Sequence, residues 1–250
     1  MLTLKRGLAI LDAFSHQPGQ LGVNEIARLV NLHKSTVSRL CATLEQMGYL
    51  ERDADGKFRL GSRVYQLAGT GASATDLRLA ARPLLQGLVE STGETAHLAV
   101  LAGVELMTIE VVEGHHLMRM QGRVGQRQLF HASALGLAIL AGLPARRVDE
   151  LLGRGQLARL TPHTVVDRTQ LRRRLGEVRT QGYSVDFEGV EEGLRCVGAA
   201  VRDSSGAIVA ALSVSGPRHR IDAEAIARLG PLGRSAADEL STRLGAPASV

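Results

Sequence analysis

Apolar residues recur at helical spacing in two consecutive stretches near the N-terminus. Between residues 23 and 30 they fall on one helical face, and a longer stripe follows an interruption at Asn31-Leu32. The longer stripe consists of Val37, Leu40, Cys41, Leu44 and Met47. We expect Ser35 to cap this second helix, because a serine side chain can accept a hydrogen bond from the first turn. The pattern therefore predicts two short helices joined by a tight turn.

The residues after this helix pair predict a small β-hairpin. Gly48 follows the last apolar position of the stripe, where a left-handed residue commonly ends a helix. Residues 49–52 and 57–60 are strand-like, and the segment 53–56 between them ends in Asp-Gly, a strong hairpin signal. A further amphipathic helix is expected over residues 4–14. Helix, turn, helix and hairpin in this order predict a winged helix-turn-helix.

The outward face of the second helix has the composition of a DNA-reading surface. Its N-terminal end carries basic and hydroxyl side chains off the apolar stripe, namely Lys34, Ser35, Thr36, Ser38 and Arg39. In a helix-turn-helix these positions reach base edges in the major groove, where arginine pairs with guanine. The hairpin adds Arg52, Lys57 and Arg59, which suit contacts with phosphates. The alternative explanation is a solvated basic face on a small helical domain.

A stretch of small residues follows the winged motif. We expect a DNA-binding domain over residues 1–61, a linker over 62–75 and a second domain over 76–250. The run 69–74 also matches a glycine-rich dinucleotide motif, which would make the chain a dinucleotide-dependent enzyme. That motif should follow a buried strand, whereas the residues before it are polar and helix-like. A flexible joint is therefore the preferred interpretation.

The second domain mixes helical and strand-like patterns. Strands are expected over residues 95–102, 105–112, 117–121, 183–187, 194–202 and 207–215. Helices are expected over residues 77–89, 134–141, 144–152, 169–181 and 222–244. Pro83 should kink its helix or mark its start, and Pro231 should interrupt the last helix. The arginines of residues 169–181 are interpreted as a solvated face. Strands with flanking helices predict the α+β class.

The charge distribution permits a polyanionic partner. The chain has 250 residues, a formal net charge of +5 and an isoelectric point near 9.7. Residues 1–65 hold nine Lys and Arg against six Asp and Glu, and the remainder holds twenty-one against nineteen. The excess per residue is thus largest in the predicted DNA-binding part, which permits a nucleic-acid partner but does not by itself establish one.

The two cysteines and the histidines do not form a convincing catalytic or metal-binding pattern in the sequence. Cys196 with Asp186 and His131 is the one candidate nucleophile arrangement, and a buried inert thiol is the simpler interpretation. His115-His116 has no further ligands at metal-binding spacing, so we expect neither a metal nor a cofactor.

Nothing in the sequence predicts export or membrane insertion. Cys41 and Cys196 lie far apart in apolar surroundings, which favours reduced thiols. No apolar run approaches membrane-spanning length, and the N-terminus lacks a signal-peptide pattern. A cytoplasmic location is the expectation.

Several sequence runs resemble the IclR family of bacterial transcription regulators. The N-terminal runs that match are LKRGLAILDAF, NEIARLVNLHKSTVSRL, LEQMGYLERD and GKFRLG. The later runs that match are RVGQRQLFHASALGLAILA, GYSVDFEGVEEGLRCVGAAVRDSSG and AALSVSGP. The resemblance covers nearly the whole chain and implies a winged helix-turn-helix, a linker helix and a C-terminal GAF-like effector-binding domain. Leu137 departs from the family, which often has Lys after the preceding glycine, and this implies altered effector preference or subunit contacts.

The resemblance also implies an effector site. The candidate residues are Ala134, Leu135, Asp186, Cys196, Ser213 and Ser215. Ala134 and Leu135 begin a predicted helix, whose exposed N–H groups favour an anion or a carbonyl oxygen. Residues matching Asp186 and Cys196 line the ligand cavity in relatives, so a small organic acid or aromatic acid derivative is expected. The alternative is that these residues only complete the fold.

These observations predict a sequence-specific DNA-binding regulator, expected to be a repressor, that a small metabolite controls. One winged module reads few bases, so we expect a homodimer or homotetramer on a pseudo-palindromic operator, with Val64 and Leu67 as a pairing surface. The alternatives are the dinucleotide-dependent enzyme and a metabolite sensor whose helix-turn-helix contacts another protein.

Overall fold

The computed structural model describes residues 2–16, 19–64 and 72–246. Contacts divide the chain into two compact units, residues 1–75 and residues 76–250. Residues 65–71, which include Leu67 and the first half of the glycine-rich run, lie outside the described residues. Residues 62–64 are helical, whereas a dinucleotide-binding motif would follow a buried strand.

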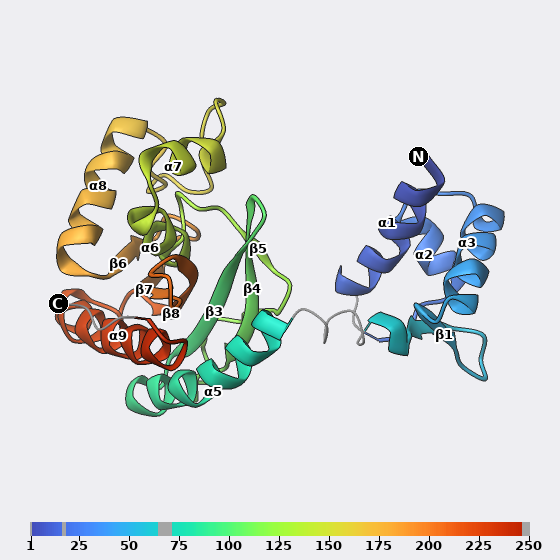
Figure 1. Ribbon diagram of the computed structural model, residues 1–250, viewed down its shortest axis with the longest axis horizontal. Coiled ribbons are helices and arrows are strands. Elements are labelled where there is room, and N and C mark those ends of the chain that lie inside the picture. The colour runs from blue at the N-terminus through green and yellow to red at the C-terminus, as the bar shows by residue number, and fades with distance from the viewer. Residues whose placement is uncertain (1, 17–18, 65–71, 247–250) are drawn as a thin grey trace. The chain divides into compact units, whose positions relative to one another are not determined.

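The first unit is a winged helix-turn-helix, as predicted (Figure 1). Its elements are α1 (Leu2–His16), α2 (Val23–Leu29), α3 (Lys34–Gln46), β1 (Leu50–Arg52) and β2 (Phe58–Leu60). The three helices enclose an aliphatic core centred on Ile10, Ile26 and Val37, and Phe58 of the wing is fully buried against it. Strands β1 and β2 pair antiparallel, with Arg52 opposite Phe58.

Local hydrogen bonds define the turn and the wing. Asn31 adopts a left-handed conformation with φ of 50° between α2 and α3, and Gly48 ends α3 with φ of 78°. In the wing turn, the Asp53 carboxylate accepts hydrogen bonds from the backbone N–H groups of Asp55 and Lys57 at 3.0 and 2.8 Å. The Asp53 side chain thus serves as acceptor for two turn N–H groups in place of a backbone carbonyl.

Two details of the predicted second helix are wrong. The residue that caps α3 is His33, not Ser35: the His33 ring nitrogen Nδ1 accepts from the Ser35 N–H at 3.4 Å. The Ser35 hydroxyl lies 2.8 Å from the same nitrogen. Met47, the last position of the apolar stripe, is 60% exposed because α3 ends at Gln46.

The second unit is built on one six-stranded antiparallel sheet with strand order β5-β4-β3-β8-β7-β6 (Figure 1). The strands are β3 (Thr95–Ala102), β4 (Glu105–Val112), β5 (Arg127–Gln128), β6 (Ser184–Phe187), β7 (Leu194–Arg202) and β8 (Ile208–Pro217). The strand predicted over residues 117–121 does not form. In that segment the carbonyls of Met118 and Met120 accept from side chains of Arg220 and Thr95, not from a neighbouring strand.

Helices cover both faces of this sheet and make two separate cores. The helices are α5 (Ala72–Thr92), α6 (Ala134–Gly142), α7 (Ala145–Leu152), α8 (Arg168–Gln181) and α9 (Ala223–Arg243). Helices α6, α7 and α8 share a core around Leu137 and Leu140, whereas α5 and α9 share one around Leu85 and Leu240. The α+β class is confirmed. No helix in the described part of the chain is both long and apolar enough to cross a lipid bilayer.

The predicted interruption at Pro231 is wrong, and Pro83 does not mark the start of its helix, whereas a kink at Pro83 stays a prediction. Pro83 lies inside α5, which starts eleven residues earlier at Ala72, and Pro231 lies inside an unbroken α9. Both prolines are exposed, so the carbonyls that lose a backbone partner can be solvated. Packing of the buried faces of α5 and α9 then keeps each helix continuous past its proline.

The arginine run of α8 is only partly a solvated face, which corrects the sequence interpretation. Arg172 and Arg173 make exposed ion pairs with Asp149 and Glu177. Arg174 instead donates to the Val185 carbonyl and lies over the Phe187 ring. Arg179 donates to the Ala141 carbonyl at 2.8 Å. The periodicity of the run could not reveal these ties because their acceptors are distant in sequence.

The start of α6 approaches the sheet closely. The Ser184 hydroxyl on β6 donates to the Ala134 carbonyl at 2.6 Å. A Cβ atom at Gly198 of β7 would lie 3.0 Å from the backbone of Ala134, so a glycine is needed beneath the helix. On the other side, a Cβ atom at Gly136 would lie 2.3 Å from the Phe130 carbonyl oxygen. Glycines on both sides therefore permit this packing.

Substituting Gly136→Ala tests the packing of α6. We expect it to lower the free energy of unfolding by about 1–3 kcal/mol, since a methyl group would overpack against backbone. The matched control is Gly176→Ala in α8, where the added Cβ meets open space. That control should stabilise by roughly 0.5–1 kcal/mol. Urea denaturation of both variants measures the difference, and equal effects would show that α6 is not closely packed.

Candidate functional site

The register of the sheet aligns polar side chains in two rows. One row runs Thr95, Ser215, Cys196 and Asp186 across β3, β8, β7 and β6. The neighbouring row runs His97, Ser213, Gly198 and Ser184 across the same strands. Residues paired directly across antiparallel strands project from the same face. Because Ser184 and Gly198 contact the start of α6, both rows lie on the face that α6 covers.

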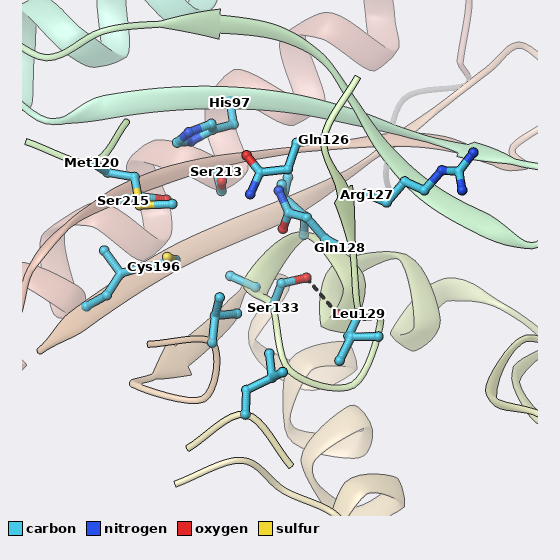
Figure 2. A pocket seen from close by; sticks show the side chains of 15 residues that line it. His97, Met120, Gln126, Arg127, Gln128, Leu129, Ser133, Cys196, Ser213 and Ser215 are labelled. Carbon is cyan, nitrogen blue, oxygen red and sulfur yellow. Dashed lines mark hydrogen bonds between the residues drawn. The ribbon is translucent and has the colours of Figure 1, made fainter. Parts of the chain in front are cut away.

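A cavity of about 230 Å³ lies between these rows, the start of α6 and the segment leading to β5 (Figure 2). Five of the six predicted effector-binding residues are in its wall: Ala134, Leu135, Cys196, Ser213 and Ser215. They come from α6, β7 and β8, which are separated by up to eighty residues in sequence and joined by the fold. This volume is below the usual range for drug-sized ligands and suits a small molecule.

Asp186, the sixth predicted residue, is fully buried and is not part of the cavity wall. Its Oδ1 atom accepts from the Gly189 N–H at 2.7 Å, and its Oδ2 atom has no partner among the described residues. Burial raises the pKa of this carboxyl to about 6, against the opposing effects of the Gly189 N–H and the Arg174 guanidinium. The structure thus places Asp186 beside Cys196, one strand away from the cavity.

The N-terminus of α6 presents two backbone donors to the cavity. The Ser133 side chain caps the helix, accepting from the Gly136 N–H at 3.1 Å and donating to the Leu129 carbonyl at 3.0 Å (Figure 2). The Leu137 N–H is the first to bond inside the helix, to the Ser133 carbonyl. Helix geometry therefore leaves the N–H groups of Ala134 and Leu135 without an intrahelical acceptor. Such a pair, at the positive end of the helix dipole, favours a carboxylate or carbonyl oxygen.

The cavity also contains polar residues that the sequence reasoning missed, chiefly His97, Gln126 and Gln128 (Figure 2). His97 is 3% exposed, and burial lowers the pKa of its imidazole to about 4, so the ring is neutral at pH 7. One sequence feature could have indicated His97 as a cavity residue. Thr95 and His97 are polar residues at alternate positions of an otherwise apolar buried strand. Alternation puts such residues on one face.

The cavity wall has one cationic side chain, that of Arg127. Its guanidinium pairs with Glu105 at 3.1 Å and extends away from His97 and Ser215 (Figure 2). Among the described residues of the cavity wall, the charged side chain of Arg127 thus does not face the serines or His97.

The candidate nucleophile arrangement is not assembled. Burial and the neighbouring Asp186 raise the pKa of the Cys196 thiol above its ordinary range, so the reactive thiolate is disfavoured. The His131 ring nitrogen Nε2 lies 2.8 Å from the Ala158 carbonyl, and no hydrogen bond joins this ring to Cys196 or Asp186 within the described residues. Within the described chain, no group of three or more potential metal ligands is found, at His115-His116 or elsewhere.

Leu137, the departure from the family pattern, is fully buried in the core that α6, α7 and α8 share. It is not among the residues of the cavity wall. An effect on effector preference would therefore have to act through packing of α6.

The predicted DNA-reading residues form an accessible surface on the first unit. Lys34, Ser35, Ser38 and Arg39 are exposed on α3, and Thr36 is partly exposed. In the wing, Arg59 bonds Glu51 at 2.9 and 3.1 Å. Arg52 lies 4.5 Å from the centre of the Phe58 ring and 3.4 Å from Glu45. The exposed Lys57 side chain makes no ion pair within the described residues.

Asp186→Asn should change how stability depends on pH. A carboxyl whose pKa rises from 3.8 to about 6 on folding contributes stability below pH 3.8, and this is lost as the pH rises through 6. Relative to wild type, the variant should therefore gain up to about 3 kcal/mol in free energy of unfolding between pH 4 and pH 7.5.

Urea denaturation across this pH range makes the measurement. His97 has the opposite effect on the free energy of unfolding, because its lowered pKa removes stability as the pH falls through 4. His97 is present in both wild type and the variant, so its effect cancels in the difference between them. Asp149→Asn, at an exposed ion pair, is the control for loss of the charge alone. A constant difference between Asp186→Asn and wild type at all pH values would contradict the argument.

Each of the two units matches a known protein family model. The family model described as "IclR helix-turn-helix domain" matches residues 3–54. The model described as "Bacterial transcriptional regulator IclR C-terminal" matches residues 70–242. These matches cover the three helices and the first wing strand of the first unit and nearly all of the second unit.

Individual relatives match over almost their full lengths. The HTH-type transcriptional regulator XynR of Escherichia coli is 35% identical over 98% of this chain and 98% of its own. The HTH-type transcriptional repressor AllR of Klebsiella pneumoniae is 34% identical over 97% of this chain and 89% of its own. The crystal structure of an IclR homologue from Microbacterium hydrocarbonoxydans, complexed with 4-hydroxybenzoate, is 30% identical with a TM-score of 0.84, covering 97% of this chain and 98% of that one.

These relatives are regulators and give no support to the dinucleotide-dependent enzyme that the glycine-rich run suggested. The two family models together span most of the chain, in the order and at the places where the two units fold. The chain belongs to the IclR family of bacterial transcriptional regulators, with a helix-turn-helix DNA-binding domain and a C-terminal effector domain.

Proposed function

We propose that this regulator is a repressor whose binding to operator DNA is controlled by a small organic acid or aromatic acid derivative in the cavity of the second unit. One observation supports this most directly. The cavity wall combines Ala134 and Leu135, whose N–H groups have no intrahelical acceptor, with the hydroxyl groups of Ser213 and Ser215. The relatives agree, since AllR is named a repressor and the Microbacterium homologue was crystallised with 4-hydroxybenzoate. Because its DNA partner lies in the bacterial cytoplasm, the proposal places the protein there.

The DNA-reading part of the proposal assigns different roles to α3 and the wing. Arg39 is exposed on α3 and makes no ion pair within the described chain, so its guanidinium is available to a base edge. The Ser35 hydroxyl is already engaged by His33 and is better suited to a phosphate than to a base. In the wing, Arg52 and Arg59 are held by Glu45 and Glu51, which leaves Lys57 as the available phosphate contact.

The effector part rests on the two ends of the cavity. The α6 end, with two N–H groups and the helix dipole, suits the carboxylate of an acid. Cys196, Leu194 and Met120 supply an apolar wall for the rest of the molecule. Asp186 supports Cys196 from the neighbouring strand in this proposal and does not itself contact the ligand.

The proposal includes pairing of two chains through the first unit. An apolar groove of about 650 Å³ runs between α1 and α3, lined in part by Leu8, Leu40, Met47 and Val64. Leu8 and Met47 are 53% and 60% exposed, unusual for large apolar side chains on a small domain. A second copy that covers this groove would bring two α3 helices to a pseudo-palindromic operator as a dimer, or as half of a tetramer.

Two substitutions test the DNA-reading roles by gel-shift titration on the upstream region of the protein's own gene. Arg39→Ala should lose roughly 1–3 kcal/mol of preference for the operator over unrelated DNA, because a base contact is removed. Lys57→Ala should weaken binding to all sequences and reduce the salt slope by about one. Arg146→Ala, a 92% exposed arginine side chain of the second unit, removes one charge elsewhere and should change neither quantity. Wild-type specificity in Arg39→Ala would refute the placement of the recognition helix, and no operator binding by wild type would refute the function itself.

Leu8→Glu tests the pairing surface. A buried carboxylate in the groove should dissociate the paired DNA-binding units and reduce operator affinity at least tenfold, whereas the isolated fold should tolerate a change at a half-exposed site. Light scattering and operator binding measure the two effects. Val104→Glu, at an exposed turn of the second unit, is the control. If Leu8→Glu assembles and binds DNA like wild type, the groove is not the interface.

A further inference from the structure

His97 is the residue of the cavity wall whose side-chain polar atoms, among the described residues, are both fully buried and without a protein partner. Its ring nitrogens Nδ1 and Nε2 are both buried and lack any hydrogen-bond partner in the described part of the chain. Buried polar groups in folded proteins are almost always hydrogen-bonded, and leaving one unpaired is destabilising. We propose that His97 is the residue that selects the effector, and that it selects a hydroxyl group on a small monocarboxylic acid. This inference rests on the effector cavity of the proposed function and adds the chemical class of its ligand.

The surroundings of His97 leave a ligand as the natural partner. Its neighbours across the sheet are Val111 on β4 and Ser213 on β8, and it lies in the same wall as Ser213 and Ser215 (Figure 2). Over the ring lies Gly122, where an added Cβ atom would be 2.4 Å from Nε2. The absence of a side chain at Gly122 lets this segment cover the imidazole and exclude bulk solvent from it.

The covering segment is held in place by the polar residues beside the cavity. The Thr95 hydroxyl, two residues before His97 on the same face, donates to the Met120 carbonyl at 2.8 Å. Arg220 donates to the Met118 carbonyl at 2.8 Å and is itself paired with the buried Glu94. These contacts hold the segment that covers His97 without using His97. The imidazole nitrogens therefore remain without a partner among the described residues.

The charge state of His97 makes a carboxylate a less favourable partner than a neutral group. Desolvation keeps the ring neutral at pH 7, so it offers one N–H donor and one lone-pair acceptor. A carboxylate only accepts, and beside a buried neutral ring it would lose its hydration without gaining an ion pair. The acid end of the ligand is better placed at the N–H groups of Ala134 and Leu135.

A hydroxyl group of the ligand is a suitable neutral partner for the His97 ring. It can donate to the imidazole lone pair or accept from the imidazole N–H, so it matches whichever nitrogen faces the ligand. Ser213, directly across from His97, can bond the same hydroxyl and complete its partners. The two ends of the cavity together therefore recognise a hydroxy acid, with the carboxylate at α6 and the hydroxyl at β3.

The test compares matched acids that differ only in the hydroxyl. The probes are 4-hydroxybenzoate with benzoate, 3-hydroxybenzoate with benzoate, and 3-hydroxybutyrate with butyrate, each titrated calorimetrically into the full chain. At least one hydroxy acid should bind wild type about tenfold or more tightly than its deoxy partner, because the deoxy acid leaves a buried nitrogen unpaired. His97→Leu should bring that ratio close to one while it retains binding of the deoxy acid. His97→Gln, which keeps a donor and an acceptor, should restore part of the preference.

A second readout separates selection from a structural role. Without ligand, His97→Leu should melt at the same temperature as wild type or a few degrees higher, because it removes unpaired buried nitrogens. A fall of many degrees would identify His97 as a packing residue and refute the inference. A hydroxyl preference that survives in His97→Leu, or no preference in wild type, would also refute it. If wild type binds the operator but none of these hydroxy acids, the ligand class is wrong while the regulator function stands.

Discussion

The close approach of helix α6 to the sheet is the constraint on which the cavity depends. The Ser184 hydroxyl holds the Ala134 carbonyl at 2.6 Å, and Gly198 leaves room beneath it. The same contact holds Ala134 and Leu135, the first residues of the helix, in the cavity wall. A larger residue at position 198 would lift the helix end and move its donors. The two polar rows would then face a helix that no longer presents an anion site.

Buried acidic groups of the second unit share one feature: each is close to an arginine from another element. Glu94 on the approach to β3 pairs with Arg220, and Glu110 on β4 pairs with Arg78 and Arg82 of α5 at 3.0 and 3.1 Å. Such pairs add little net stability, because desolvation offsets their attraction, but breaking one leaves a buried charge and is costly. They therefore fix how the elements are oriented. Asp186 is held less tightly: Arg174 of α8 is near enough to lower the pKa of its carboxyl, but the two make no ion pair within the described residues, and burial raises that pKa overall.

The sequence predicted most of the fold because most of its elements are locally encoded. Alternation located β3, β4 and β7 with the bounds observed, and Asp-Gly located the wing turn. The failures depend on contacts between distant residues. The segment 117–121 alternates like a strand, but its carbonyls are bonded by Arg220 and Thr95. Five cavity residues followed from the family resemblance, whereas His97 did not, because its importance lies in what surrounds it rather than in a motif. The register that sets it opposite Ser213 exists only in the folded sheet.

The two cysteines have a practical consequence. Cys41 is buried in the first unit, where desolvation raises its pKa to about 11, and Cys196 is buried in the second. A thiol reagent in neutral solution can therefore attack the Cys41 sulfur only after the first unit opens, whereas Cys196 lies in the wall of a cavity that a small reagent can enter. Labelling kinetics at Cys41 would follow the opening equilibrium of the first unit, much as amide exchange does. Labelling at Cys196 would respond instead to occupancy of the cavity, so the two natural thiols would report separately on the DNA-reading unit and on the ligand-sensing unit.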